Sequence, residues 1–151
     1  MEITKSESRK TFRLVISNQI SALRQMSTWL DTIIRPLGIA EELVFNLDLC
    51  ADEAVTNIIS YAYPENGVHE IALQLSIWNE ALSLEIEDDG VAFNLLDWPE
   101  HVRPESLDDA SIGGLGIDLI RNFMDECSYS RQQGRNILKM VAHIARQINQ
   151  Q

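Results

Sequence analysis

Two runs of alternating residues, Glu70–Trp78 and Ala81–Asp88, most constrain how this chain can fold. Isoleucine or leucine recurs at every second position in both runs, so each run predicts a strand with one buried face. Only Asn79 and Glu80 separate the two strands, and such a short connection joins antiparallel neighbours. The sequence therefore predicts a sheet that has one face packed against a second layer.

Helices are predicted before this pair of strands. Thr11–Ser17 predicts a short first strand, and Asn18 is expected to cap a helix that runs to about Ile34. A second helix is predicted from Ala40 to Ala62, because apolar residues recur there at helical spacing. Both helices have an apolar face with which to cover the sheet.

The second half of the chain predicts a loop, a helix and a hairpin. Periodicity disappears between residues 90 and 116, and a loop of this length is typical of a lid or a binding loop. Leu115–Glu126 predicts a helix, and Cys127–Arg131 with Asn136–Ile144 predicts a hairpin around Gln133-Gly134. The order of elements predicts an α+β fold, a two-layer sandwich with helices on one face of a mostly antiparallel sheet. Residues 1–151 are expected to form a single domain.

Composition excludes several classes of function. A formal net charge of -11 disfavours binding to nucleic acid or to an anionic membrane, because both surfaces are negative. No segment approaches the length of a membrane span, and the first ten residues do not resemble a signal peptide. Cys50 and Cys127 lie in apolar stretches and favour free thiols in a cytoplasmic protein, although a disulfide stays open. The three histidines are scattered, which disfavours a histidine metal site.

Glu53 and Asn57 are the first candidates for chemistry. They are four residues apart on the second predicted helix, so both side chains lie on the same face. A carboxylate in this place can accept a proton, and a carboxamide oxygen can bind a hard cation such as Mg2+. Considered alone, the pair is more often a solvated patch on a helix.

Two further elements carry candidate residues. Strand alternation places Asp88 on the buried face, in line with apolar neighbours, where an ionised carboxylate requires a hydrogen-bond donor such as the amino group of adenine. The cluster Gly113-Gly114-Leu115-Gly116 directly precedes a predicted helix, where free N–H groups can face a phosphate. Each of these motifs alone is commonly an ordinary turn or loop. Their occurrence together, in this order, favours a nucleotide site.

These segments resemble a known family. DEAVTNIISYAYPEN, IEDDGVAFN and GGLGIDLIRNFMDE are similar to the N box, G1 box and G2 box of the ATP-binding superfamily of gyrase, heat-shock chaperones, histidine kinases and MutL (GHKL). Within that superfamily, the chain resembles the anti-sigma-factor serine/threonine kinases of the RsbW and sporulation type. The resemblance covers essentially the whole chain.

The resemblance implies a role for each matching residue. Glu53 corresponds to the acid that activates the attacking group, and Asn57 to the magnesium ligand. Asp88 corresponds to the residue that binds adenine, with Gly90 beside it. The implied phosphate loop contains Gly114, Leu115 and Gly116, and the implied ligands are ATP and Mg2+.

The resemblance also implies what the chain does. It implies a kinase that holds a sigma factor inactive and phosphorylates an anti-anti-sigma partner of the STAS type, and it implies a homodimer. Ala92, Tyr61 and Ile112 depart from the family pattern, which leaves open a nucleotide-dependent switch module without significant kinase activity. A detached ATP domain of a histidine kinase is disfavoured, since those kinases normally lack a glutamate at the position of Glu53.

Overall fold

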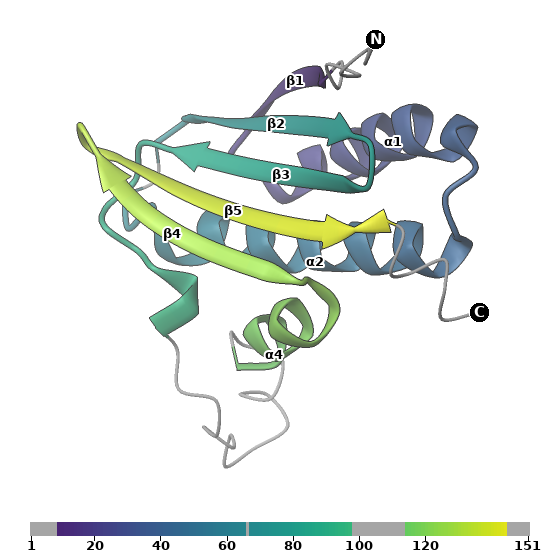
Figure 1. Ribbon diagram of the computed structural model, residues 1–151. Coiled ribbons are helices and arrows are strands. Elements are labelled where there is room, and N and C mark those ends of the chain that lie inside the picture. The colour runs from purple at the N-terminus through teal and green to yellow at the C-terminus, as the bar shows by residue number, and fades with distance from the viewer. Residues whose placement is uncertain (1–8, 66, 98–113, 145–151) are drawn as a thin grey trace, which may run out of the picture.

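A computed structural model of the protein describes residues 9–65, 67–97 and 114–144. Five strands form one antiparallel sheet in the order β1-β2-β3-β5-β4. The strands are β1 (Lys10–Ser17), β2 (Glu70–Trp78), β3 (Ala81–Asp88), β4 (Glu126–Gln132) and β5 (Arg135–His143). The α-helices described are α1 (Leu23–Ile34), α2 (Glu41–Tyr61) and α4 (Gly114–Phe123), and the short 3-10 turns are η1 (Ile20–Ala22), η2 (Arg35–Leu37) and η3 (Leu95–Asp97). The helices lie on one face of the sheet (Figure 1), which confirms the predicted α+β sandwich.

The strand register explains where the core lies. Ile71 pairs with Asp88, and further pairs along β2 and β3 bring leucine and isoleucine side chains together on the same face. This face is buried under the helices, and Leu73 and Leu84 are fully buried there. Asp88 continues the row and is 1% exposed, as the alternation of its strand predicts.

Helix α2 is the central element of the helical layer. Its buried residues recur at helical spacing, as expected for an amphipathic helix packed on a sheet. Glu41 and Glu42 lie in its first turn, where a carboxylate interacts favourably with the helix dipole. The helix continues to Tyr61, and its C-terminal end lies beside the turn that follows β3, because Val91 N–H donates to the carbonyl of Ala62 at 2.8 Å.

Two predicted boundaries were wrong. Asn18 does not cap a helix: its Nδ2 donates to Gly67 O at 3.1 Å and its Oδ1 accepts from His69 N at 2.9 Å. The side chain therefore joins the end of β1 to the start of β2, and α1 begins only after a 3-10 turn. Helix α4 ends at Phe123 rather than Glu126, because Glu126 already pairs with Val141 in the sheet.

The C-terminal hairpin and the cysteines follow the prediction. Gln133 and Gly134 connect β4 to β5 with φ angles of 52° and 77°, the positive values of a two-residue hairpin turn. Cys50 and Cys127 are free thiols, and their Sγ atoms donate to backbone carbonyls of α4.

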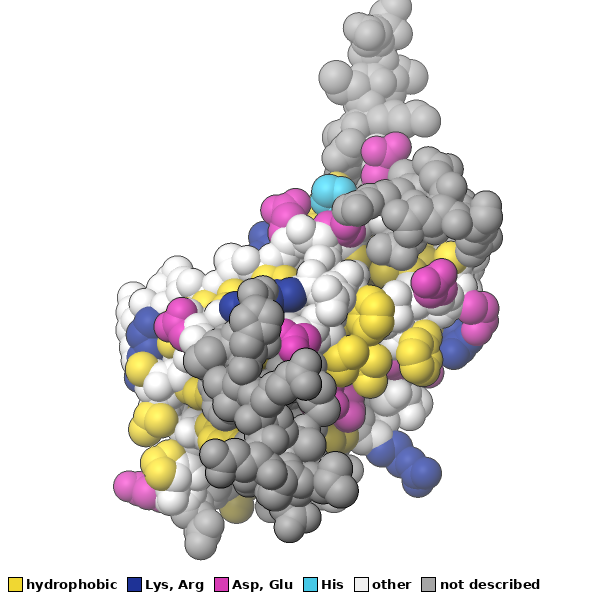
Figure 2. Space-filling model, turned by 90° about the horizontal axis from the view of Figure 1, so that it is seen from below, with side chains coloured by type: hydrophobic (Ala, Val, Ile, Leu, Met, Phe, Trp, Pro, Cys, Tyr) yellow, Lys and Arg dark blue, Asp and Glu magenta, His cyan; other side chains and the backbone are white. Residues whose placement is uncertain are grey.

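Charged side chains of the described residues are distributed over the surface without forming a large patch of one sign on the face shown in Figure 2. Acidic and basic side chains are scattered among hydrophobic ones on the face seen in Figure 2, and the described residues form no continuous basic patch there. Within the described ranges, no helix is both long enough and apolar enough to cross a membrane.

Candidate functional site

Asp88 is a buried carboxylate with one atom left unsatisfied. Its Oδ1 accepts hydrogen bonds from Gly90 N–H at 2.9 Å and from Asn136 Nδ2 at 2.8 Å. Its Oδ2 is buried and has no protein partner. Burial raises the pKa of Asp88 above its usual value, although the hydrogen bonds from Asn136 and Gly90 oppose that effect. A buried acceptor without a donor is rare in a folded core, so Oδ2 suits a ligand that donates a hydrogen bond.

Asn136 lies opposite Asp88 in the register of β3 and β5. Its side chain is 3% exposed, and its Nδ2 also donates to Val91 O at 2.8 Å. Its Oδ1 accepts from Phe93 N–H at 3.2 Å, from Arg131 Nη1 at 3.0 Å and from the hydroxyl of Tyr129. One carboxamide thus connects β3, the turn after it and both strands of the C-terminal hairpin.

Gly90 allows the turn after β3 to approach helix α2. A Cβ atom at this position would lie 2.3 Å from the carbonyl oxygen of Ala62, which is too close for any side chain. Arg131 Nη1 donates to Gly90 O at 2.9 Å and so links the turn to β4. The close contact with α2 therefore requires glycine at position 90.

A small cavity lies between these elements. It is lined by residues of α2, β3, η3, β5, β4 and the turn after β3: Ile58, Asp88, Phe93, Leu95, Tyr129, Asn136 and Leu138. Its volume of about 10 Å³ is close to the minimum for a single water molecule. An adenine ring is far larger than this volume, so the lining residues would have to move apart to admit one.

Glu53 and Asn57 lie on α2 in the turns that precede Ile58. Asn57 Nδ2 donates to the carbonyl of Glu53 at 2.7 Å, which directs the Oδ1 atom away from that carbonyl. Asn57 is 4% exposed, while Glu53 is only partly buried. Burial and the nearby charge of Asp52 raise the pKa of Glu53, which makes its carboxylate a stronger base. An amide oxygen and a carboxylate are suitable ligands for Mg2+.

The predicted glycine motif lies at the N-terminus of α4. Gly114 is the first residue of the helix, followed by Leu115 and Gly116. Ile117 and Ile120 are fully buried, and Cys50 Sγ of α2 donates to Leu119 O at 3.7 Å. Helix α4 therefore packs against α2. Most of the loop between residues 90 and 116, including Ile112 and Gly113, lies outside the described residues.

Tyr61, which departs from the family pattern, and two arginine side chains have contacts of their own. Tyr61 packs against Phe93 with ring centroids 5.7 Å apart. Arg121 donates to Leu96 O at 2.5 Å. Arg135 pairs with Glu87 at 3.1 Å on the opposite face from Asp88.

Sequence reasoning missed Asn136, Tyr129 and Arg131. The sequence pattern predicts a strand at Asn136 and no role in the site, yet Asn136 lies in line with the apolar residues Leu138 and Met140. That alternation is the same signal that identified Asp88. A polar residue on the buried face of the last strand could therefore have been identified as a candidate.

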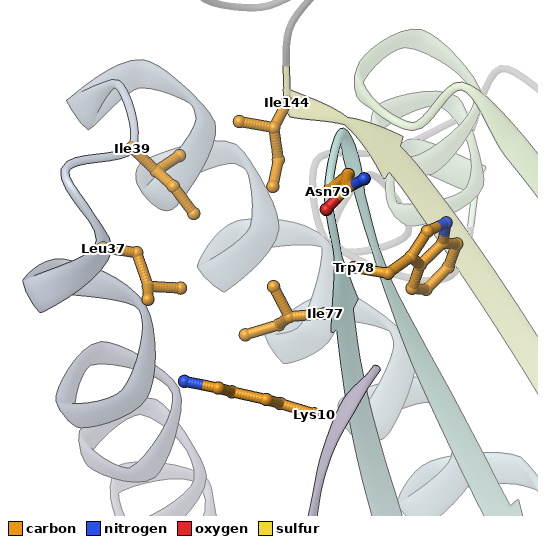
Figure 3. Close-up of a pocket in the computed structure, with 7 residues that line it drawn as sticks. All are labelled: Lys10, Leu37, Ile39, Ile77, Trp78, Asn79 and Ile144. Atoms are coloured by element: carbon orange, nitrogen blue, oxygen red, sulfur yellow. The ribbon is translucent and has the colours of Figure 1, made fainter. Parts of the chain in front are cut away.

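A second hollow lies at the other end of the sheet. Its volume is about 270 Å³, and it is lined by Lys10, Leu37, Ile39, Ile77, Trp78, Asn79 and Ile144. In Figure 3, Leu37, Ile39, Ile77 and Ile144 point into this hollow, and the stem of Lys10 crosses one side of it. Lys10 is the one charged residue in the lining, so this hollow lacks the acidic groups of the Asp88 site.

A different pair of carboxyl groups lies between α1 and α2. Burial, and after it the neighbouring carboxyl of Asp31, raise the pKa of Asp48 to about 7. Ser27 Oγ donates to Asp48 Oδ1 at 3.4 Å, while Asp31 Oδ1 is buried without a partner. A proton shared by the two carboxyl groups would satisfy both of them.

Comparison with known proteins identifies relatives of the whole chain. The family model for the histidine kinase-like ATPase domain matches residues 16–142. The serine/threonine-protein kinase BtrW of Bordetella bronchiseptica is 36% identical over 138 residues, which cover 91% of this chain and 97% of BtrW. The serine-protein kinase RsbW of Bacillus cereus is 29% identical over 74% of this chain and 71% of its own length.

Solved structures share the fold at lower identity. The RsbU and RsbW domains of a Mycobacterium tuberculosis protein match with a TM-score of 0.59 and 10% identity, over 88% of this chain and 31% of that one. The histidine kinase domain of a blue-light activated kinase from Erythrobacter litoralis matches with a TM-score of 0.56 and 17% identity, over 86% and 63% of the two chains. These matches support the α+β architecture.

Proposed function

The chain belongs to the histidine kinase-like ATPase domain family and is related along its length to serine/threonine-protein kinases, and from this premise we propose that it is an anti-sigma factor kinase. It binds a sigma factor and uses ATP to phosphorylate a STAS-type anti-anti-sigma partner. It acts in the cytoplasm as a homodimer of a single domain, residues 1–151, with residues 90–116 as the lid over the nucleotide.

The buried and unsatisfied Oδ2 of Asp88 is the observation that carries the proposal. An adenine amino group supplies the donor that this atom lacks, and the neighbouring cavity is lined largely by apolar side chains that suit a purine ring. Asn57 offers an amide oxygen to Mg2+, and the N-terminus of α4 at Gly114, Leu115 and Gly116 offers N–H groups to phosphates. Bound Mg2+ would neutralise the charge of the phosphates.

Glu53 has the catalytic role in this proposal. Its carboxylate accepts the proton of the partner's serine hydroxyl, and its raised pKa favours that transfer. A phosphoserine carries about two negative charges, and the kinase has a net charge of -11. Electrostatic repulsion therefore favours release of the phosphorylated partner.

Two measurements test the proposal. Calorimetric titration with Mg-ATP should give a saturable heat of binding. Intact-mass analysis of a STAS partner incubated with the protein and Mg-ATP should then show a gain of one phosphate on serine or threonine. Binding of ATP without any gain in mass would instead support the switch module, and an acid-labile phosphohistidine would support a histidine kinase. Absence of ATP binding would contradict all three.

A further inference from the structure

The carboxamide of Asn136 has only one orientation that satisfies its neighbours. Its Nδ2 faces two acceptors, Asp88 Oδ1 and Val91 O, both at 2.8 Å. Its Oδ1 faces three donors, on Phe93, Tyr129 and Arg131. Rotation of the amide by 180° would place oxygen against oxygen on one side and N–H against N–H on the other. The surrounding groups therefore fix this side chain.

The fixed amide in turn orients the carboxylate of Asp88. Oδ1 is held by Asn136 and by the backbone N–H of Gly90, so the carboxylate cannot rotate without loss of both hydrogen bonds. Oδ2 is consequently the atom left for a ligand. Both Asp88 and Asn136 line the small cavity, which places this arrangement at the surface that a base would contact.

We propose that Asn136, held by Tyr129 and Arg131, is a positioning residue that sets Asp88 to accept a hydrogen bond from a purine 6-amino group and so determines adenine specificity. The inference rests on the proposed nucleotide site. It adds Asn136 on β5, and Tyr129 and Arg131 on β4, to Asp88 as determinants of base recognition.

Charge explains why the orientation matters for specificity. An ionised carboxylate only accepts hydrogen bonds, so it pairs with a 6-amino group and repels the 6-oxo group of guanine or hypoxanthine. A protonated carboxyl could donate to the 6-oxo group. Burial raises the pKa of Asp88, whereas the hydrogen bonds from Asn136 and Gly90 and the charge of Arg131 lower it, and the charge of Asp89 raises it. Asn136 therefore helps to keep Asp88 ionised, and the ionised form is the one that distinguishes adenine from guanine.

The test compares two ligands in two proteins. Asn136→Leu removes the donor and keeps the number and branching of the side-chain heavy atoms. Calorimetry with Mg-ATP and with the triphosphate of purine riboside, which lacks the 6-amino group, should show a selective effect. We expect the variant to lose about tenfold or more in affinity for ATP but less than about threefold for the analogue. The preference for ATP over GTP should decrease as well.

Gln132→Leu is the matched control. Gln132 is the neighbour of Arg131 on β4, but it is exposed, and its amide donates to Ser130 Oγ at 3.4 Å. Its substitution should leave both affinities unchanged. Tyr129→Phe is the milder second variant, because it keeps the ring and removes one donor to Asn136. It should reduce ATP affinity by about threefold, again more than that of the analogue.

The outcomes separate this inference from the proposed function. Equal losses of affinity for ATP and for the analogue in both variants would show that Asn136 is merely structural, and they would overturn the inference. The proposed function would stay intact in that case, as long as the unaltered protein binds ATP. Failure of the unaltered protein to bind ATP would overturn the proposed function together with the inference.

Discussion

Asp88 and Asp48 are two carboxyl groups with raised pKa values in very different surroundings. Burial is the largest cause for both. Asp88 has two donors on Oδ1 and an open Oδ2 beside a cavity. Asp48 lies between two helices, where its main neighbours are the Ser27 hydroxyl and the carboxyl of Asp31. The first arrangement stabilises a carboxylate and leaves one atom for a ligand, whereas the second favours a shared proton.

The contrast shows which observation identifies a binding site. A perturbed pKa occurs in both regions, so it does not distinguish them. What distinguishes Asp88 is the set of donors that orients it and the cavity that this residue lines. The following predictions test this distinction.

Glu53→Gln should have the largest effect, since Glu53 is the proposed base. Phosphoryl transfer to a STAS partner should fall about 100- to 10,000-fold, because the amide cannot accept the hydroxyl proton. Affinity for ATP should stay nearly unchanged. Single-turnover assays by intact mass and calorimetry measure the two quantities. Full activity in this variant would remove Glu53 from the mechanism.

Asp88→Asn should reduce ATP affinity about 100-fold, because an acceptor of one charged hydrogen bond is lost and an amide N–H can face the adenine amino group. Asp48→Asn is the matched variant and should leave ATP affinity unchanged. Calorimetric titration of both proteins with Mg-ATP checks the difference. Equal losses in the two variants would contradict the distinction drawn between the two carboxyl groups.

Gly90→Ala should destabilise the fold by about 3 kcal/mol, because the new methyl group would overlap the backbone carbonyl of Ala62. Gly134→Ala is the comparison, since its positive φ of 77° leaves strain of about 1 kcal/mol and a Cβ there would meet nothing within 4 Å. Urea denaturation of the two variants measures both changes. A smaller loss of stability for Gly90→Ala than for Gly134→Ala would mean that the turn after β3 can move away from α2.

Asp48→Asn should change how stability depends on pH. The pKa of Asp48 is raised to about 7 in the folded protein and is about 3.9 when unfolded. The folded state therefore keeps a proton between these values, so this contribution to stability is complete below about pH 4 and is lost as pH rises to about 7. With allowance for partial exposure, the effect is about 1 kcal/mol. Denaturation at pH 5 and pH 8 should show that the free energy of unfolding declines less in the variant than in the unaltered protein as the pH rises.

Local patterns predicted the parts of the site that lie within single elements. Strand alternation placed Asp88 on the buried face, and helical spacing placed Glu53 and Asn57 together. Alternation alone marks Asn136 as a polar residue on a buried face, but its contact with Asp88 depends on the pairing of β3 with β5, between residues 48 positions apart. The sequence contains no local signal of that pairing, so the partner of Asp88 became visible only in the structure.

The wrong boundaries have the same origin. Asn18 has the side chain of a helix cap, but a distant turn at Gly67 and His69 uses its hydrogen-bonding groups instead. Glu126 continues a helical pattern, but pairing with Val141 draws it into the sheet. In both places a contact with a remote segment outweighs the local preference.

The contact between Gly90 and the carbonyl of Ala62 has a consequence for how this family can diversify. It fixes the spacing between the end of one helix and the end of one strand to within the size of a methyl group. Insertions that create new partner preferences must therefore enter the chain elsewhere, in connections that do not pass through this junction. Divergent relatives should vary in loop length while a residue without a side chain persists at this one position.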